Sequence, residues 1–281
     1  MLNALSVDIE DWFHVGAFET VIARESWESL PSRVERNSDA VLELFEEAGV
    51  KATFFTLGWV AERHPALMRR IVAAGHEVAS HGWDHRRVFT MDAAAFRADL
   101  ARARVAIEDA AGVSPGGYRA PSFSIDARTP WAHPVLEEAG YAYSSSVAPI
   151  RHDHYGWPEA PRFAHRPLAE GRLIELPVTT VELAGRRMGA GGGGFFRILP
   201  DQLSTWAIDR VNRVEQRPAI FYFHPWEIDP GQPRVAGAPL KSRLRHYTRL
   251  SVMRGKLLKL LNSYEWGRVD QVIGQEALRP Q

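Results

Sequence analysis

The chain has 281 residues, and its 34 lysines and arginines balance 34 aspartates and glutamates, so the formal net charge is zero. Proteins that coat nucleic acid usually carry a basic excess, so we expect no nucleic-acid partner. The chain contains no cysteine. This excludes disulfide scaffolds, thiolate metal sites and cysteine nucleophiles, and any metal must therefore be held by histidine and carboxylate.

Apolar residues make up 45% of the chain and charged residues 24%, which is typical of a globular protein, and we expect one domain over residues 1–281. The first residues lack the basic start and apolar stretch of a signal peptide. The sequence contains no run of about 18 apolar residues, which a membrane span would need. We therefore expect a cytoplasmic protein with no transmembrane segment.

Short apolar segments alternate with amphipathic ones through the first half of the chain. The predicted strands lie at residues 5–9, 52–57, 77–80 and from 118 onward, and the predicted helices at 32–48, 65–74, 92–111 and 130–139. This alternation predicts βαβ units in a mainly parallel α/β barrel or wound sheet. In such folds the functional residues lie at the carboxyl ends of the strands.

The pattern loosens from about residue 144 to 200, where only 173–176 and 178–183 read as strands. Because 219–223 resumes a buried strand, we interpret this part as loop insertions within one domain. Residues 241–261 predict a basic helix, with seven lysines or arginines and no acid. A cationic outer face of a barrel helix is the favoured interpretation, and contact with an anionic membrane or polymer is the alternative.

Carboxylates and histidines follow two of the predicted strands. Asp8 and Glu10 are two residues apart and would face the same side of a strand, whereas a turn after Glu10 would bring Asp11 there instead. His81 and His85 are four apart, which would place them on one face of a helical turn. Two histidines and one carboxylate with open positions suit Zn²⁺, and Co²⁺, Mn²⁺ or Fe²⁺ also fit. A bare histidine pair is common by chance, so surface or core-lining histidines remain the alternative.

Two more polar residues follow predicted strands. Arg119 can pair with a carboxylate through its guanidinium fork. His224 ends an apolar strand and precedes a proline, which makes it a candidate general acid or base. His76 lies at the opposite end of its strand and is interpreted as structural.

Taken in order, these motifs resemble the polysaccharide deacetylase family, also called NodB homology or carbohydrate esterase family 4. More narrowly they resemble the branch associated with exosortase and PEP-CTERM exopolysaccharide loci. The matching segments are Ser6–Trp12, Ala52–Phe55, Gly75–His81 with His85, Tyr118–Phe123 and Phe223–Glu227. The resemblance implies a distorted (β/α) barrel that binds one divalent metal, usually zinc.

Residue by residue, the resemblance implies that His81 and His85 bind the metal. Asp8 matches the catalytic base, Arg119 the arginine that holds the base, and His224 the late catalytic histidine. The family commonly supplies a second aspartate as the third ligand. Here Glu10 or Asp11 must take that role, and we prefer Asp11.

Two departures from the family pattern are visible. Ser122 is inserted before Phe123, in the loop expected to donate a backbone N–H to an oxyanion. Ser144–Ser146 stands where relatives often have an aspartate, which leaves the support of the late histidine open.

The resemblance implies hydrolysis of N-acetyl groups on amino sugars of an oligo- or polysaccharide, in exopolysaccharide biosynthesis. The expected substrate contacts are Trp12, Pro121, Ser122, Phe123, Phe195 and Trp226. The glycine-rich segment 189–194 is interpreted as a flexible surface loop or as a loop that shapes the sugar groove. The alternatives are an amidohydrolase acting on a small cyclic amide and a catalytically silent carbohydrate-binding barrel.

Overall fold

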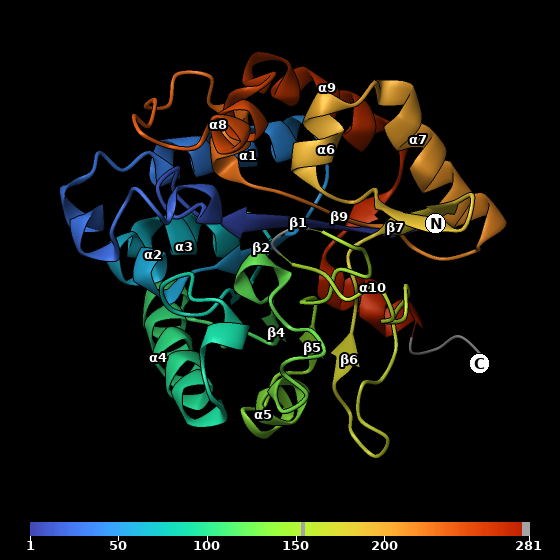
Figure 1. Cartoon of the computed structure of the whole chain (residues 1–281), viewed down its shortest axis with the longest axis horizontal. Helices are drawn as coiled ribbons and strands as arrows, with labels where there is room; N and C mark the ends of the chain where they lie inside the picture. The colour runs from blue at the N-terminus through green and yellow to red at the C-terminus, as the bar shows by residue number, and fades with distance from the viewer. Residues whose placement is uncertain (153–154, 277–281) are drawn as a thin grey trace.

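The computed structural model describes residues 1–152 and 155–276, and its centre is one curled sheet of eight strands (Figure 1). The strands are β1 (Asn3–Ile9), β2 (Thr53–Thr56), β3 (Glu77–Ser80), β4 (Gly117–Tyr118), β5 (Tyr143–Ser144), β6 (Ile174–Glu175), β9 (Ile220–Phe223) and β10 (Trp266–Gly267). Their order is β10-β1-β2-β3-β4-β5-β6, β9 also pairs with β1, and all these pairings are parallel. The expected distorted α/β barrel is confirmed.

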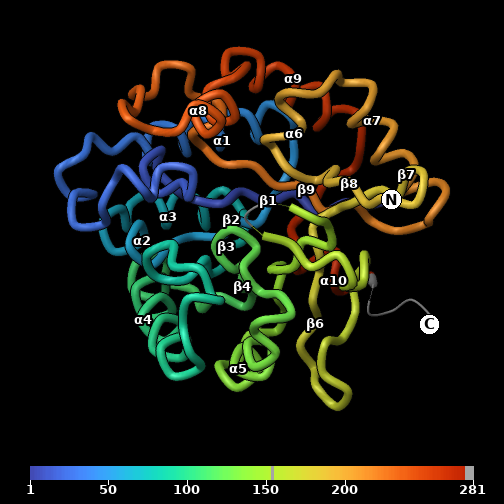
Figure 2. The backbone as a smooth tube through the Cα atoms, in the orientation of Figure 1, coloured from blue at the N-terminus to red at the C-terminus, as the bar shows by residue number. Residues whose placement is uncertain are grey.

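Helices surround this sheet, as the backbone trace shows (Figure 2). They are α1 (Val34–Ala48), α2 (Gly58–Arg63), α3 (Pro65–Ala73), α4 (Ala93–Ala111), α5 (Ala132–Glu138), α6 (Gly193–Ile198), α7 (Asp201–Asp209), α8 (Leu240–Tyr247), α9 (Leu250–Ser263) and α10 (Val269–Glu276). The helices expected before residue 140 are present within about two residues at each end, while α2 was not expected.

Local sequence signals explain where the longer helices begin and end. Asp92 caps α4 by accepting a hydrogen bond from the backbone N–H of Ala95 at 2.8 Å. Gly49 and Gly112 end α1 and α4 with φ of 66° and 71°, a conformation that glycine adopts without steric cost. The inner face of α1 buries Val41, among other side chains, in the main core cluster.

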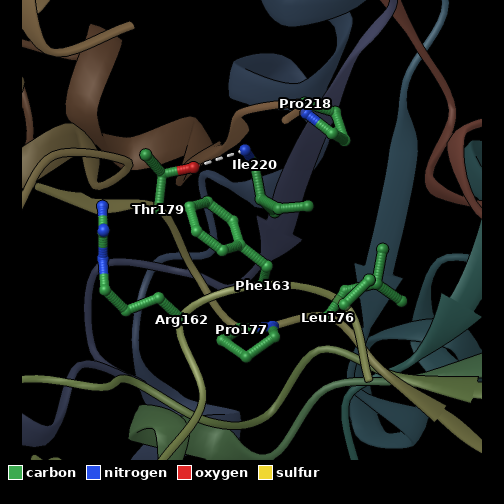
Figure 3. Close-up of a pocket in the computed structure, with 8 residues that line it drawn as sticks. Arg162, Phe163, Leu176, Pro177, Thr179, Pro218 and Ile220 are labelled. Carbon is green, nitrogen blue, oxygen red and sulfur yellow. Dashed lines mark hydrogen bonds between the residues drawn. The ribbon is translucent and has the colours of Figure 1, made fainter. Parts of the chain in front are cut away.

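The barrel is closed at one seam by loop contacts in place of a continuous strand ladder. The Thr179 N–H donates to the Ile220 carbonyl at 3.3 Å, and the Ile220 N–H donates to the Thr179 hydroxyl (Figure 3). A cavity of about 10 Å³ lies there against Phe163 and Pro218. It is too small for a substrate, because one water already needs a volume of about this size.

The insertion after residue 144 forms more regular structure than expected. It includes the antiparallel hairpin of β7 (Thr180–Leu183) and β8 (Arg186–Gly189), separate from the main sheet, followed by α6 and α7. The expected single helix over 241–261 is wrong. It is divided into α8 and α9, because Arg249 adopts a left-handed conformation with φ of 58°.

Candidate active site and metal centre

Three side chains that follow β1 and β3 meet at one edge of the sheet. β1 and β3 both pair with β2 in parallel, so their carboxyl ends lie at the same edge. Glu10 Oε1 lies 3.0 Å from His81 Nε2 and 3.0 Å from His85 Nε2, and all three side chains are buried. One ligand atom from each residue lies within 4.8 Å of the other two. This cluster, the Glu10–His81–His85 triad, has the composition of a metal centre with open positions.

The two histidines converge for a reason other than the expected helical turn. Residues 81–85 form a bend outside any helix, with Gly82 at φ of 75° and His85 at φ of 60°. His81 Nδ1 donates to the Arg119 carbonyl at 2.8 Å, which leaves Nε2 as the nitrogen that faces Glu10. A second hydrogen bond of this kind fixes the tautomer of metal-binding histidines.

Asp11 lies elsewhere, so our preference for Asp11 as the third ligand is corrected to Glu10. One oxygen of the Asp11 carboxylate accepts hydrogen bonds from the Ser32 hydroxyl at 2.7 Å and from the backbone N–H groups of Arg33 and Val34 at 2.7 and 3.0 Å. The other accepts the Trp12 N–H at 2.9 Å. Asp11 therefore holds the N-terminus of α1.

The surroundings of Glu10 keep it ionised. Burial alone would raise its pKa, but the charges of His85 and His224 and hydrogen bonds from His81 and His85 hold the pKa well below its usual range. Once the two imidazole Nε2 atoms release their protons, as metal binding requires, the ionised carboxylate and the two nitrogens form a donor set that fits a divalent transition metal.

Asp8 is held by Arg119 beside this triad. Arg119 Nη1 donates to Asp8 Oδ1 at 2.7 Å and to the Ser6 hydroxyl at 2.8 Å. Its Nε and Nη2 donate to the carbonyl and hydroxyl of Ser145 at 3.1 and 2.9 Å. Arg119 is completely buried. Ser145, in the serine segment 144–146, therefore supports the arginine.

His224 completes the edge from β9. Its Nε2 lies 4.0 Å from Asp8 Oδ2 and 3.9 Å from Glu10 Oε1. Its Nδ1 donates to Glu227 Oε1 at 3.0 Å. Burial would lower the pKa of His224, but Glu10, Glu227 and Asp8 raise it to about 9.

Glu227 lies in one of the matching motifs, but we predicted no role for it from the sequence. In the structure it supports His224. Besides the ring contact, its Oε1 also accepts the backbone N–H of His224 at 3.2 Å. The signal was available in the sequence, since the first turn of a helix brings its N-cap and N3 residues together and Glu at N3 commonly bonds back to the cap.

The glycine-rich segment is not an exposed surface loop, because Gly191, Gly192 and Gly193 are buried and pack against β9 and the residues that follow it. Added Cβ atoms at Gly191, Gly192 and Gly193 would lie 2.2 Å from the Ile220 carbonyl oxygen, 3.0 Å from the Tyr222 ring and 2.4 Å from Glu227 Oε1. Glycine allows this close approach, to the backbone of β9 at Gly191 and to side chains at Gly192 and Gly193.

Most of the expected substrate contacts are interior residues. Trp12, Pro121, Phe123 and Trp226 are buried, and only Ser122 and Phe195 among the six expected contacts are partly exposed. The Phe123 N–H already donates to the Ala120 carbonyl at 3.0 Å, so it is not available to an oxyanion. The Trp226 ring instead stacks on His224, with centroids 5.0 Å apart.

His14 was missed by the sequence interpretation. Its Nδ1 accepts the Asp11 N–H at 2.9 Å, and burial lowers its pKa to about 3, so the ring is neutral. The ring packs between Trp27 and Trp59 at centroid distances of 4.4 and 5.0 Å. A cavity of about 230 Å³ is lined by His14 and His85 and therefore lies beside the triad.

Comparison with known proteins divides the chain into two matched regions. Residues 26–144 match the family model described as polysaccharide deacetylase, and residues 145–274 match a domain of unknown function, DUF3473. The chain is 33% identical over 107 residues to a peptidoglycan deacetylase of Helicobacter pylori, covering 38% of this chain and 36% of that protein. It is 34% identical over 90 residues to a chitin deacetylase of a Pestalotiopsis species, covering 31% and 30%. The matched region thus spans about a third of these relatives.

Solved structures extend the similarity of fold to nearly the whole chain. A Mycobacterium smegmatis protein described as a polysaccharide deacetylase aligns with a TM-score of 0.61 at 22% identity, covering 99% of this chain and 91% of that chain. An allantoinase aligns with a TM-score of 0.60 at 18% identity, with the same coverage. These identities indicate a shared fold alone. Residues 26–144 thus match the polysaccharide deacetylase family, and the same sheet continues into the DUF3473 segment at residues 145–274.

Proposed function

We propose that this protein hydrolyses N-acetyl groups on amino sugars within an oligo- or polysaccharide. The observation that carries the proposal is the convergence of a metal-type triad, a held carboxylate and a late histidine at one edge of the sheet. The curated relatives, whose names refer to deacetylation of peptidoglycan and chitin, support the same reaction class. An exopolysaccharide as the natural polymer is part of the proposal and rests on the resemblance of the motifs.

The residues that would hold the metal are Glu10, His81 and His85, through Oε1 and the two Nε2 atoms. We expect Zn²⁺, because a site of two histidines and one carboxylate is common for catalytic zinc. When bound, such an ion supplies Lewis acidity, which polarises a carbonyl group and makes water more acidic.

Asp8 is the proposed general base. Its Oδ1 is held by Arg119, which leaves Oδ2 to accept a proton from the attacking water. Arg119 also fixes the orientation of Asp8, because the ion pair is buried and further hydrogen bonds hold the guanidinium in place.

His224 is the proposed general acid. Glu227 and Asp8 both raise the pKa of His224 and so favour its protonated form, and Glu227 holds its Nδ1 so that Nε2 faces the reaction space. Transfer of that proton to the amine lets the carbon–nitrogen bond break. The acetyl group and the oxygen of water leave as acetate, and the sugar keeps a free amine.

A second candidate is hydrolysis of a small cyclic amide, because the allantoinase matches this fold as well as the deacetylase does. The two reactions are separated by incubating the metal-loaded protein with N-acetylglucosamine oligomers and, in parallel, with a cyclic ureide. We expect acetate release from the oligomers and no ring opening. Ring opening without acetate release would replace the proposal with the second candidate, and no reaction with either would favour a silent carbohydrate-binding barrel.

A further inference from the structure

The outer face of α8 exposes two leucines to solvent. Leu240 is 69% exposed and Leu244 is 59% exposed, which places both among the most exposed apolar side chains described. They are four residues apart and therefore neighbours on one face of the helix. The opposite face contributes the buried His246. An exposed leucine pair of this kind has no role in the packing of the barrel.

Positive charge surrounds this pair. Residues 231–264 contain eight lysines and arginines and no acidic residue, although the whole chain is neutral. Some of these cations pair with acids on other helices, as Arg254 does with Glu47 at 2.7 Å. Arg243 and Arg249 are exposed, and neither forms an ion pair among the residues that the structure describes. Apolar and cationic groups thus share one outward face.

We propose that α8 rests on an anionic membrane surface, with Leu240 and Leu244 inserted at the interface and the surrounding cations facing lipid phosphates. This combination of leucines and basic residues on a helix is typical of interfacial membrane contacts. None of the helices in residues 1–152 and 155–276 is long and apolar enough to cross a bilayer. The contact therefore concerns the surface of the membrane only.

The composition of this face favours a membrane over two other occupants. A second copy of this chain would place two cationic faces against each other, and two leucines supply far less than the roughly 800 Å² per partner of a stable interface. An anionic polymer would use the cations but gain nothing from inserted leucines. Both remain distinguishable outcomes of the test.

Docking at α8 would place the candidate site close to the membrane. The inner face of the helix contributes His246, whose ring stacks on Trp226 at 4.2 Å, and Trp226 stacks on His224 at 5.0 Å. Phe18, in the short helix η1 (Gly16–Phe18), also packs on His246 at 4.6 Å. A substrate attached to a lipid would thus find the site beside the surface that carries it.

Vesicle co-sedimentation of the whole chain tests this inference. The probes are phosphatidylcholine vesicles and vesicles that also contain about 30% phosphatidylglycerol. The variants are Leu240→Ser with Leu244→Ser, and Arg243→Gln with Arg249→Gln. Leu203→Ser is the matched control, because Leu203 is 48% exposed on α7. Unchanged unfolding temperatures show that each variant is folded.

We expect the wild type and Leu203→Ser to bind only the anionic vesicles. Substitution of the two leucines should weaken binding at least about tenfold. Substitution of the two arginines should weaken it about fivefold for each charge removed. Absence of binding by the wild type would overturn the inference. Binding that depends on the arginines but not on the leucines would also overturn it, because charge alone would then act, as it would with an anionic polymer. A leucine-dependent dimer, seen by sedimentation velocity without vesicles, would overturn it as well. None of these results depends on catalytic activity, so they leave the proposed function untouched.

Discussion

Glu10 and Asp11 are adjacent in the sequence and have different partners in the structure. Glu10 faces His81 and His85, whereas Asp11 accepts four hydrogen bonds around the start of α1. The sequence narrows the third ligand to these two carboxylates. It cannot choose between them, because the choice depends on where the chain turns after β1, and that turn depends on its packing against α1.

The first prediction compares these neighbours. Glu10→Gln should reduce bound metal from about one ion per chain to a small fraction, because a neutral amide is a much weaker ligand than a carboxylate. Asp11→Asn should keep the metal and lower the free energy of unfolding by about 1 kcal/mol, because one of the two accepting oxygens becomes an NH2 group that cannot accept. Elemental analysis and chemical denaturation of both variants check this. The reverse pattern would restore Asp11 as the ligand.

The second prediction concerns His224 and its support. His224→Ala should lower kcat about 10²-fold to 10⁴-fold, as expected for loss of a general acid, with metal content unchanged. Glu227→Gln should give a smaller loss in kcat with little change in KM, because the histidine remains but its ring is held less firmly. Steady-state kinetics of acetate release measure both. Equal activity of His224→Ala and wild type would remove His224 from the mechanism.

At the scale of elements, parallel strands and capped helices could be predicted because their signals are local. The alternating apolar segments locate β1 to β3, and Asp92 and Gly112 mark the ends of α4. The approach of His81 to His85 was predicted for the wrong reason, since the backbone at Gly82 is left-handed and no helix forms. The burial of the glycine-rich segment could not be predicted, because it depends on contact with β9, which is distant in sequence.

The third prediction uses two neighbouring glycines in α6. A Cβ at Gly193 would lie 2.4 Å from Glu227 Oε1 and 2.7 Å from Phe223 Cβ, whereas nothing lies within 4 Å of a Cβ at Gly194. Gly193→Ala should therefore cost about 1–3 kcal/mol of stability and reduce turnover by displacing Glu227. Gly194→Ala should be neutral or slightly stabilising, because alanine favours helix. Urea denaturation that finds equal stability for the two variants would contradict the packing described here.

At the scale of the whole molecule, the site draws on three stretches of the chain. Asp8 and Glu10 precede both matched regions, His81 and Arg119 lie in the deacetylase region, and His224 lies in the DUF3473 region. The sheet is continuous across the boundary between these regions, because β5 pairs with both β4 and β6. Residues 1–276 therefore build one site from one barrel, apart from 153–154, which lie outside the described residues.

The fourth prediction concerns acid stability, away from the site. His76 Nδ1 accepts the Ala52 N–H at 3.0 Å, and burial, together with the charges of Lys51 and Arg268, lowers its pKa from 6.5 to about 4. The unfolded chain therefore binds a proton that the folded chain does not between these pH values. Stability from this group is complete above pH 6.5 and is lost as the pH falls towards 4, by up to about 3 kcal/mol.

His76→Asn tests this loss of stability at low pH, because asparagine offers an acceptor oxygen near the position of Nδ1 but takes up no proton. We expect the variant to lose less stability than the wild type between pH 6.5 and 4. The measurement is the free energy of unfolding by denaturant across this range. Parallel pH profiles for the two proteins would show that His76 is not the group responsible.

The most direct test of the catalytic account is acetate release from N-acetylglucosamine oligomers by metal-loaded wild type and Asp8→Asn, with metal content measured on the same samples. The account predicts about one metal per chain in both proteins and a loss of at least about 10²-fold in turnover for Asp8→Asn. This separates the base, Asp8, from the ligands Glu10, His81 and His85. Full turnover by metal-loaded Asp8→Asn, or a wild type that binds no metal under any loading condition, would contradict the account.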